Sequence, residues 1–525
     1  MHLQQFPDFE LRKLNELVHD YCTANDSLRY FFEVPPLRDE IAKYGEQRSF
    51  SSHHYAVLHE VLLDQYTGYS REKTVDANIE AIGNRQAVTV TTGHQLCLFG
   101  GPAYLLYKVL CTIKLAQVVQ ASTNELKVVP VFWLASEDHD RDEINHAFFK
   151  NKRFQWDTQQ QGAVGRFRND EFGSLISQWV EAIEEDGLRN QMNTIWRKAE
   201  KSSTWAHATK SWIHDCFGEW GLVTIDADDV RLKRLFTPCM KKELFQQTTY
   251  TSVIETNDKL AQRGYSAQVN PRLINLFYLS DQYRVRIEKK ADVWSTVDGL
   301  HQWSETSIEN ELDEHPENFS PNVLLRPLYQ ETILPNIAYV GGPGELAYWL
   351  QLRSTFDAFN VMMPALVLRD SAILLSAGGA KRLAKLGLSN KDILHDKSQL
   401  IELLVGKDKE EFQEERLQLQ KVYDQIAAHV ARIDPTLKAA AMAELQRVLS
   451  GIDQLASKAW KAEKLKQEQK FSSLDKLWEE LYPNGKWQER SENVLTQSMA
   501  NDKQLMHALL AEFQTPKSTL VIVVN

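Results

Sequence analysis

The stretch RQAVTVTTGHQLCLFGGPAYLLYK, Arg85–Lys108, decides the fold. Its β-branched first part is typical of a buried strand that ends in a turn at Thr92–Gly93. After Gly100–Gly101 comes Pro102, and from there apolar residues recur at helical spacing. Proline suits the first helical position because it has no N–H to leave unpaired there. The stretch therefore predicts a strand, a glycine-rich turn and a helix.

The strand–helix pattern repeats along the chain. The segment KVVPVFWLA, Lys127–Ala135, predicts a second strand, so strand, helix and strand follow one another within about fifty residues. Such a βαβ unit argues for parallel strands. Further strands are expected in WGLVTIDAD (Trp220–Asp228), in NIAYV from Asn336, which runs into a second turn at Gly341–Gly344, and in MMPALVLR. We expect an α/β fold with a doubly wound parallel sheet.

The sequence past about Gly378 has heptad-like spacing. Between Glu411 and Ile433, and again after the helix-breaking Asp434–Pro435, apolar residues recur at intervals of three, four and seven. The expected seam residues are Phe412, Leu419, Tyr423, Ile426, Val430, Ile433, Ala441, Leu445, Val448, Ile452, Leu455, Ala459 and Ala462. Two such helices joined by a short break predict an antiparallel helical hairpin.

These patterns suggest a division of the chain. We expect a core over residues 1–380, with polar, irregular insertions near 151–203 and 268–320. A helical coiled-coil domain should cover 381–470, and a C-terminal segment, 471–525, should return to the core. The apolar end LVIVV is expected to dock as a strand, because an exposed edge of this composition would aggregate.

Composition limits the classes of function. The net charge of -11 disfavours binding to nucleic acid or anionic membranes. No apolar run is long enough for a transmembrane helix, and the first twenty residues do not resemble a signal peptide, so a cytoplasmic protein is expected. Five widely spaced cysteines without a CxxC motif argue against a disulfide framework or a zinc ribbon and for reduced thiols.

Both glycine-rich turns are candidates for anion binding. A glycine lets a ligand approach the backbone, and the N–H groups that begin a helix favour negative charge. Two such turns in one parallel sheet would face the same crevice, although Gly-Pro at a helix start is also ordinary architecture. The expected binding residues are Gly93, Gln95, Gly100, Gly101, Gly341, Gly342, Gly344 and Glu345. His94, in the first turn, could donate to an oxyanion or move a proton, or could simply hydrogen-bond its own turn.

An acidic segment, SEDHDRDEINH, follows the second strand. Candidate catalytic residues are Glu137, Asp138, His139 and Asp140. Acids at this place could hold a substrate amine, act as a general base or bind a hard metal ion, although the spacing matches no defined metal motif. A solvated loop is the simpler alternative. We favour Asp138 and His139 as bases because they lie close to the rigid end of the strand.

Arg326 lies in NVLLRPLYQETILPN, shortly before the second glycine-rich turn. Its guanidinium could bind a carboxylate with two parallel hydrogen bonds. A structural ion pair, for which Glu331 is the nearest acid along the segment, is an equal alternative.

Four segments together resemble the bacillithiol synthase family, the cysteine ligases of bacillithiol biosynthesis. They are TGHQLCLFGGPAYLLYK, VPVFWLASEDHDRDEINH, VLLRPLYQETILPNIAYVGGPGELAYW and YPNGKWQER, in the family's order and spanning about residues 91 to 490. Many members carry Gln at the position of His94, which weakens any mechanism that rests on His94 alone.

The resemblance implies a Rossmann-like core with connecting-peptide insertions similar to those of class I aminoacyl-tRNA synthetases, and a C-terminal coiled coil that forms a homodimer. It implies an amide-forming ligase that adds cysteine to glucosaminyl malate in the last step of thiol biosynthesis. Because amide formation from a free carboxylate is uphill in water, ATP is the expected activating co-substrate, yet no Walker A or KMSKS-like segment is present.

Two other readings remain open on the sequence. Another amide-forming or nucleotidyl-transferring enzyme could use the same fold, and substrate trials would separate the two. A non-catalytic scaffold built on the coiled coil is a different class of protein. It would leave the acidic segment and the paired glycine-rich turns without a role.

Overall fold

The computed structural model describes residues 2–7, 14–69, 72–169, 172–405, 412–466 and 468–524. The chain forms two compact units. One contains Gln4–Ile373 and Glu489–Val521, and the other contains Leu374–Gln488 with short stretches at both termini. No helix in these ranges is both long enough and apolar enough to cross a bilayer.

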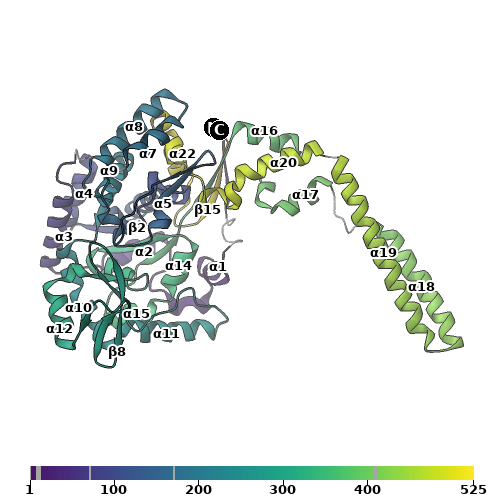
Figure 1. The fold of residues 1–525 in the computed structure, drawn as a ribbon, viewed down its shortest axis with the longest axis horizontal. Coiled ribbons are helices and arrows are strands. Elements are labelled where there is room, and N and C mark those ends of the chain that lie inside the picture. The colour runs from purple at the N-terminus through teal and green to yellow at the C-terminus, as the bar shows by residue number, and fades with distance from the viewer. Residues whose placement is uncertain are drawn as a thin grey trace. The chain divides into compact units, whose positions relative to one another are not determined.

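The larger unit is built on a five-stranded parallel sheet in the order β13-β12-β2-β3-β6. Figure 1 labels β2 of this sheet, with α5 near it. Its strands are β2 (Ala87–His94), β3 (Lys127–Leu134), β6 (Val223–Asp226), β12 (Asn336–Gly341) and β13 (Ala365–Leu368). Every neighbouring pair is parallel. This confirms the predicted α/β fold with a Rossmann-like parallel sheet.

The strand order places a topological switch point between β2 and β12. The chain builds the sheet outward from β2 through β3 to β6, and then returns to add β12 and β13 on the other side of β2. In open α/β sheets, ligands bind at the carboxyl ends of the strands at such a point. The two glycine-rich turns follow the two strands that flank it.

Helices pack against the sheet so that its strands are buried on both faces, which explains why their sequences are continuously apolar. The helix α5 (Ala103–Gln120) packs against β2 and β3, α14 (Pro343–Leu350) against β12 and β13, and α9 (Trp205–Phe217) against β6. Tight packing on both sides fixes the strand ends from which the turns project.

Two further groups of elements lie between the sheet strands in sequence. The first consists of a hairpin of β4 (His146–Phe149) and β5 (Lys152–Gln155) with α7 (Gly173–Glu181) and α8 (Asp186–Glu200). The second is an antiparallel sheet, in the order β10-β9-β8-β7-β11. Its strands are β7 (Leu276–Leu279), β8 (Arg284–Lys290), β9 (Val293–Thr296), β10 (Gln302–Trp303) and β11 (Phe319–Pro321).

The smaller unit is helical. It contains α16 (Ala377–Lys385), α17 (Lys397–Val405), α18 (Gln413–Ile433), α19 (Leu437–Lys466) and α20 (Glu468–Leu481). The helices α18 and α19 pack against each other as the predicted hairpin. Glu411, at the start of the predicted stretch, lies outside the described residues.

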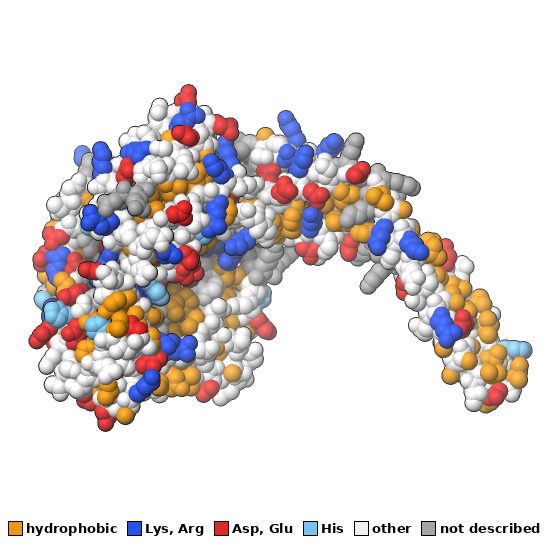
Figure 2. Space-filling view, viewed as in Figure 1, with side chains coloured by type: hydrophobic (Ala, Val, Ile, Leu, Met, Phe, Trp, Pro, Cys, Tyr) orange, Lys and Arg blue, Asp and Glu red, His pale blue; other side chains and the backbone are white. Residues whose placement is uncertain are grey.

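The seam of the hairpin differs from the predicted one at four positions. Ile426, Ile433 and Leu455 are 42%, 73% and 60% exposed, and Ala462 is exposed as well. Leu445 is buried as predicted, and Ala427 and Ala456 are buried in addition. The contact between the two helices therefore lies at Ala427 and Ala456, each one residue after the predicted seam residue, because small side chains let the helices approach closely. Figure 2 shows hydrophobic side chains among the charged ones on the surface of this hairpin.

The end of the chain forms a strand, as expected from its composition. β15 (Thr519–Val524) lies between β1 (His2–Pro7) and β14 (Ser371–Leu375) in a separate three-stranded sheet. Both edges of this apolar strand are thus paired.

Candidate functional site

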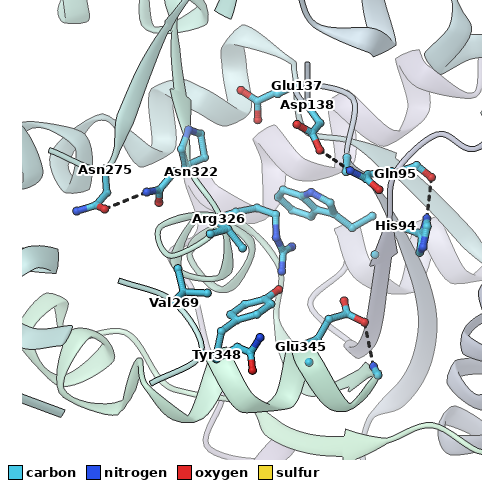
Figure 3. A pocket seen from close by; sticks show the side chains of 18 of the residues that line it. His94, Gln95, Glu137, Asp138, Val269, Asn275, Asn322, Arg326, Glu345 and Tyr348 are labelled. Carbon is cyan, nitrogen blue, oxygen red and sulfur yellow. Dashed lines mark hydrogen bonds between the residues drawn. The ribbon is translucent and has the colours of Figure 1, made fainter. Parts of the chain in front are cut away.

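A cavity of about 730 Å³ lies at the carboxyl ends of β2, β3 and β12, next to the switch point. The first glycine-rich turn, the acidic segment after β3 and the start of α14 all contribute to its wall (Figure 3). Further parts of the wall come from the antiparallel sheet, the segment before β7, the start of α13 (Arg326–Ile333), Arg369 and Arg490. Predicted site residues that line it are Gly93, His94, Gln95, Glu137, Asp138, Arg326, Gly342, Gly344 and Glu345. Segments distant in the sequence thus meet where the strand order predicts a ligand site.

His94 is held as a neutral imidazole. Its Nδ1 lies 3.0 Å from the carbonyl oxygen of Gln95 and its Nε2 lies 3.1 Å from the hydroxyl of Tyr104. Burial, with the nearby charge of Lys108, lowers the pKa of His94 to about 4. Both ring nitrogens have partners in the protein, so this geometry matches the alternative of a histidine bonded to its own turn.

A buried ion pair joins the two glycine-rich turns. Lys108, on α5, donates to both carboxylate oxygens of Glu345, at 2.8 and 2.9 Å, and to the carbonyl oxygen of Gly93. Glu345 also accepts from the Gly342 N–H at 2.9 Å and from the Tyr339 hydroxyl at 2.6 Å. Although burial opposes it, the charge of Lys108 and these hydrogen bonds lower the pKa of Glu345 to about 2. Glu345 therefore caps its own helix.

The two acids of the acidic segment that reach the cavity have opposite electrostatic environments. Burial raises the pKa of Glu137, whose carboxylate lies 2.8 Å from Lys233 Nζ. Burial acts in the same direction on Asp138, but hydrogen bonds from His139 and Gln95 and the charge of Arg284 lower its pKa overall. Asp138 is therefore an ionised, weakly basic carboxylate, and Glu137 is the more basic of the two.

Two other residues of the acidic segment do not line the cavity. Asp140 accepts from the Glu143 N–H at 3.3 Å and caps the short helix α6 (Arg141–Ile144). His139 is half exposed, and its Nδ1 accepts from Arg284 at 3.1 Å. These contacts indicate that both residues stabilise the segment. Asp140 accepts from an N–H group that is free at the helix start, and His139 contacts Arg284.

The glycines Gly100, Gly101 and Gly341 also lie outside the cavity wall. Gly101 has a φ of +60°, and its carbonyl accepts from Asn493 at 2.8 Å. A Cβ at Gly101 would lie 2.6 Å from the Cβ of Cys97. The double glycine permits a tight turn that accepts hydrogen bonds from the C-terminal segment. An anion-binding role for Gly100 and Gly101 stays a prediction.

Arg326 begins α13 (Arg326–Ile333) and its guanidinium reaches the cavity (Figure 3). Its Nη1 donates to Gln330 at 3.1 Å, and the Tyr348 hydroxyl lies beside the guanidinium (Figure 3). Its buried Nη2 makes no hydrogen bond of good geometry among the described residues. Glu331 pairs instead with Arg48 at 3.1 Å. The alternative of an ion pair with Glu331 is therefore wrong, and Arg326 keeps an unused donor.

Most of the cavity's cations were not identified from the sequence. Besides Arg326, the wall contains Arg272, Arg284, Arg286, Arg369 and Arg490. One signal was available, because Arg284 and Arg286 are two apart in a strand and so point to the same face. Arg369 also had a signal, because it ends the predicted strand MMPALVLR, whereas Arg272 and Arg490 come from segments without strand periodicity. Among the described residues, no cluster of three metal-binding side chains is present.

Comparison with known proteins agrees with the fold and the motifs. The family described as "Bacillithiol biosynthesis BshC, N-terminal Rossmann-like domain" matches residues 2–370, and its C-terminal coiled-coil domain matches residues 372–524. Relatives named "Putative cysteine ligase BshC" include that of Cytophaga hutchinsonii, 37% identical over 95% of this chain and 94% of the relative. That of Flavobacterium johnsoniae is 35% identical over 95% of each chain, and that of Bacillus cytotoxicus 27% identical over 92% of this chain and 93% of the relative. The chain belongs to the BshC family of bacillithiol biosynthesis.

Proposed function

We propose that this protein is a ligase that joins the carboxyl group of cysteine to the amine of glucosaminyl malate, forming an amide in the last step of bacillithiol biosynthesis. The relatives' printed names support a cysteine ligase. The acceptor, the amide bond and the place in the sequence of reactions are our proposal. We expect this biosynthetic reaction in the cytoplasm.

The observation that carries the proposal is the charge of the cavity wall. Each of its three acids already has a cation nearby: Glu137 has Lys233, Asp138 has Arg284 and Glu345 has Lys108. Two of its arginines, Arg286 and Arg369, are paired with Glu288 and Glu489.

Three guanidiniums remain, namely Arg272, Arg326 and Arg490, which no ion pair joins to a carboxylate in the described part of the chain. Cysteine carries one carboxylate and glucosaminyl malate carries two. The protein as a whole carries a net charge of -11. The unpaired cations of this cavity nevertheless favour such anionic ligands locally.

The chemistry requires an activated donor and a base. With ATP as co-substrate, the cysteine carboxylate would become an acyl phosphate or an adenylate. The glucosamine nitrogen then bonds to the carboxyl carbon, phosphate or AMP leaves with the C–O electron pair, and one amine proton passes to a base. Glu137 has the raised pKa that suits the base, and ionised Asp138 suits an electrostatic partner for the ammonium group.

The experiment that tests the proposal is a reconstitution. Purified protein is incubated with cysteine and glucosaminyl malate, with and without ATP, and the products are analysed by mass spectrometry. We expect the ligated thiol, and AMP or ADP in equal amount, only in the complete mixture. Serine in place of cysteine and glucosamine in place of glucosaminyl malate are the controls. Absence of product with every nucleoside triphosphate would contradict the proposal.

We also propose a homodimer that forms through the hairpin of α18 and α19. Within one hairpin the seam covers only part of the apolar surface, since Ile433, Leu455 and Leu465 stay exposed. A second copy of the same hairpin would bury these side chains, as the heptad spacing favours.

A further inference from the structure

The segment Glu489–Asn493 packs on the first glycine-rich turn. Asn493 donates to the carbonyls of Phe99 and Gly101, both at 2.8 Å. The carbonyl of Glu492 accepts from the Ala103 N–H, which begins α5, at 2.9 Å. This segment is therefore held firmly against the turn and the start of α5.

The residue before Arg490 is locked in place. Glu489 is buried and accepts from both terminal nitrogens of Arg369, at 2.8 and 2.6 Å, and from the hydroxyl of Ser371. A bidentate pair of this kind restricts both partners in orientation. The backbone of Arg490 is thus held from both sides, by Glu489 and by the hydrogen bonds of Glu492 and Asn493.

Arg490 itself is exposed and lines the cavity. No ion pair with a carboxylate engages its guanidinium among the residues that the structure describes. Burial raises the pKa of the neighbouring Tyr104, and the positive charge of Arg490 opposes that rise, which indicates that the guanidinium is close to this part of the wall. A free cation on a rigid backbone is a pre-organised donor for an anionic ligand.

We infer that Arg490 binds a carboxylate of the malate portion of the acceptor, and that the Arg369–Glu489 pair positions it. The inference rests on the proposed function. Arg326 supplies one guanidinium to the same cavity, and a ligand with two carboxylates can engage both. Glu489 and Arg369 act through Arg490 and are positioning residues.

Binding measurements test the role of Arg490 and do not require catalytic turnover. Isothermal titration with glucosaminyl malate compares the wild-type chain with Arg490→Gln, Arg490→Lys and Glu489→Gln. The control is Lys486→Gln, which removes a positive charge from an exposed residue four positions earlier that does not line the cavity. We expect Arg490→Gln to weaken binding about tenfold or more, the scale of a lost charge-assisted hydrogen bond. Arg490→Lys should lose less, and the control should bind as the wild type does.

Two further parts of the experiment test the positioning role of Glu489 and the class of ligand that Arg490 binds. Glu489→Gln should also weaken binding, and the double variant should be no weaker than Arg490→Gln alone, because the two residues act as one unit. Additive losses would overturn the positioning role. Methyl glucosaminide, which lacks the malate carboxylates, should bind wild type and Arg490→Gln equally, and ATP should do the same.

The outcomes distinguish this inference from the proposed function. If the wild-type chain does not bind glucosaminyl malate, the proposed function is overturned, and the role of Arg490 with it. If the wild type binds and Arg490→Gln binds equally, only the role of Arg490 is overturned. If Arg490→Gln weakened the binding of ATP alone, Arg490 would be assigned to a phosphate group and the carboxylate assignment would be overturned.

Discussion

The Nζ of Lys108 lies 2.8 and 2.9 Å from the two carboxylate oxygens of Glu345, and it also donates to the carbonyl of Gly93. One buried cation thus connects the end of β2 with the start of α14, the helix that follows β12, and β2 and β12 flank the switch point. Lys108 does not line the cavity, yet it sets the spacing of the two turns that do. The consequences of this pair can be measured.

Lys108→Met should destabilise the larger unit by about 3–5 kcal/mol, because it leaves Glu345 without its cation. The double variant Lys108→Met with Glu345→Gln should lose less, since no unpaired charge remains. Urea unfolding followed by tryptophan fluorescence measures both. A double variant less stable than the single one would show that the charge pair is not the main contribution.

His94 predicts a pH dependence of stability. In the unfolded chain the imidazole takes up a proton below pH 6.5, whereas in the folded chain it does so only near pH 4. Between these values the unfolded state binds more protons, so stability falls as the pH is lowered. From pH 7 to pH 5 this residue should cost about 2 kcal/mol. His94→Gln should remove that part, which unfolding free energies of both proteins at both pH values would reveal. An equal loss in the two proteins contradicts the assignment.

How much of the site the sequence could predict depends on the range of the interactions. Gly93 and Asp138 were predictable because Gly93 lies at the end of β2 and Asp138 follows β3, and the carboxyl ends of parallel strands share one edge of the sheet. Arg490 was not, since its place depends on Asn493 and Glu489 docking on segments more than a hundred residues away. Local pattern carries no information about such contacts.

The errors have physical causes as well. Glu331 was close to Arg326 in sequence, but in a helix that begins at Arg326 the tertiary partner Arg48 takes the carboxylate. In the hairpin, heptad counting preferred the bulky Ile426 over Ala427, whereas close packing of the two helices placed the small residue at the contact.

Arg326→Gln should weaken the binding of substrates that carry a carboxylate by about tenfold or more, because the unpartnered Nη2 is the donor that such a group would use. Arg326→Lys keeps the charge but loses the fork of donors, so it should recover binding only in part. Titrations with cysteine and with glucosaminyl malate would show which ligand the residue serves. Unchanged affinity for both would remove Arg326 from the site.

The proposed dimer can be tested at its exposed apolar residues. Replacing Ile433 and Leu455 together by Gln should shift the protein from dimer to monomer in light scattering at micromolar concentration, because these side chains would lie in the contact. Replacing exposed Leu37, which belongs to the larger unit, by Gln is the matched control. A wild-type protein that is monomeric at this concentration contradicts the proposal.

Glu137 and Asp138 are proposed to have different roles in turnover. Asp138 is the proposed electrostatic partner of the ammonium group, and the loss of such a partner should lower turnover by about 10²-fold or more. Asp138→Asn keeps the shape and the contact with Gln95 but removes the charge beside Arg284. We expect that loss of turnover in Asp138→Asn, with a smaller change in substrate affinity.

The pH profile separates the two roles. Asp138 has a lowered pKa, so a limb of the profile that rises above the ordinary carboxyl range cannot come from its titration, whereas Glu137, whose pKa burial raises, can produce one. Glu137→Gln should therefore abolish the limb, and Asp138→Asn should keep it at lower amplitude. The Glu137 variant leaves Lys233 with Asp228 at 3.0 Å, so the fold retains a partner for that cation. If Asp138→Asn, folded by circular dichroism, turned over at the wild-type rate, Asp138 would have no part in turnover, and a limb that persisted in Glu137→Gln would place the base elsewhere in the cavity.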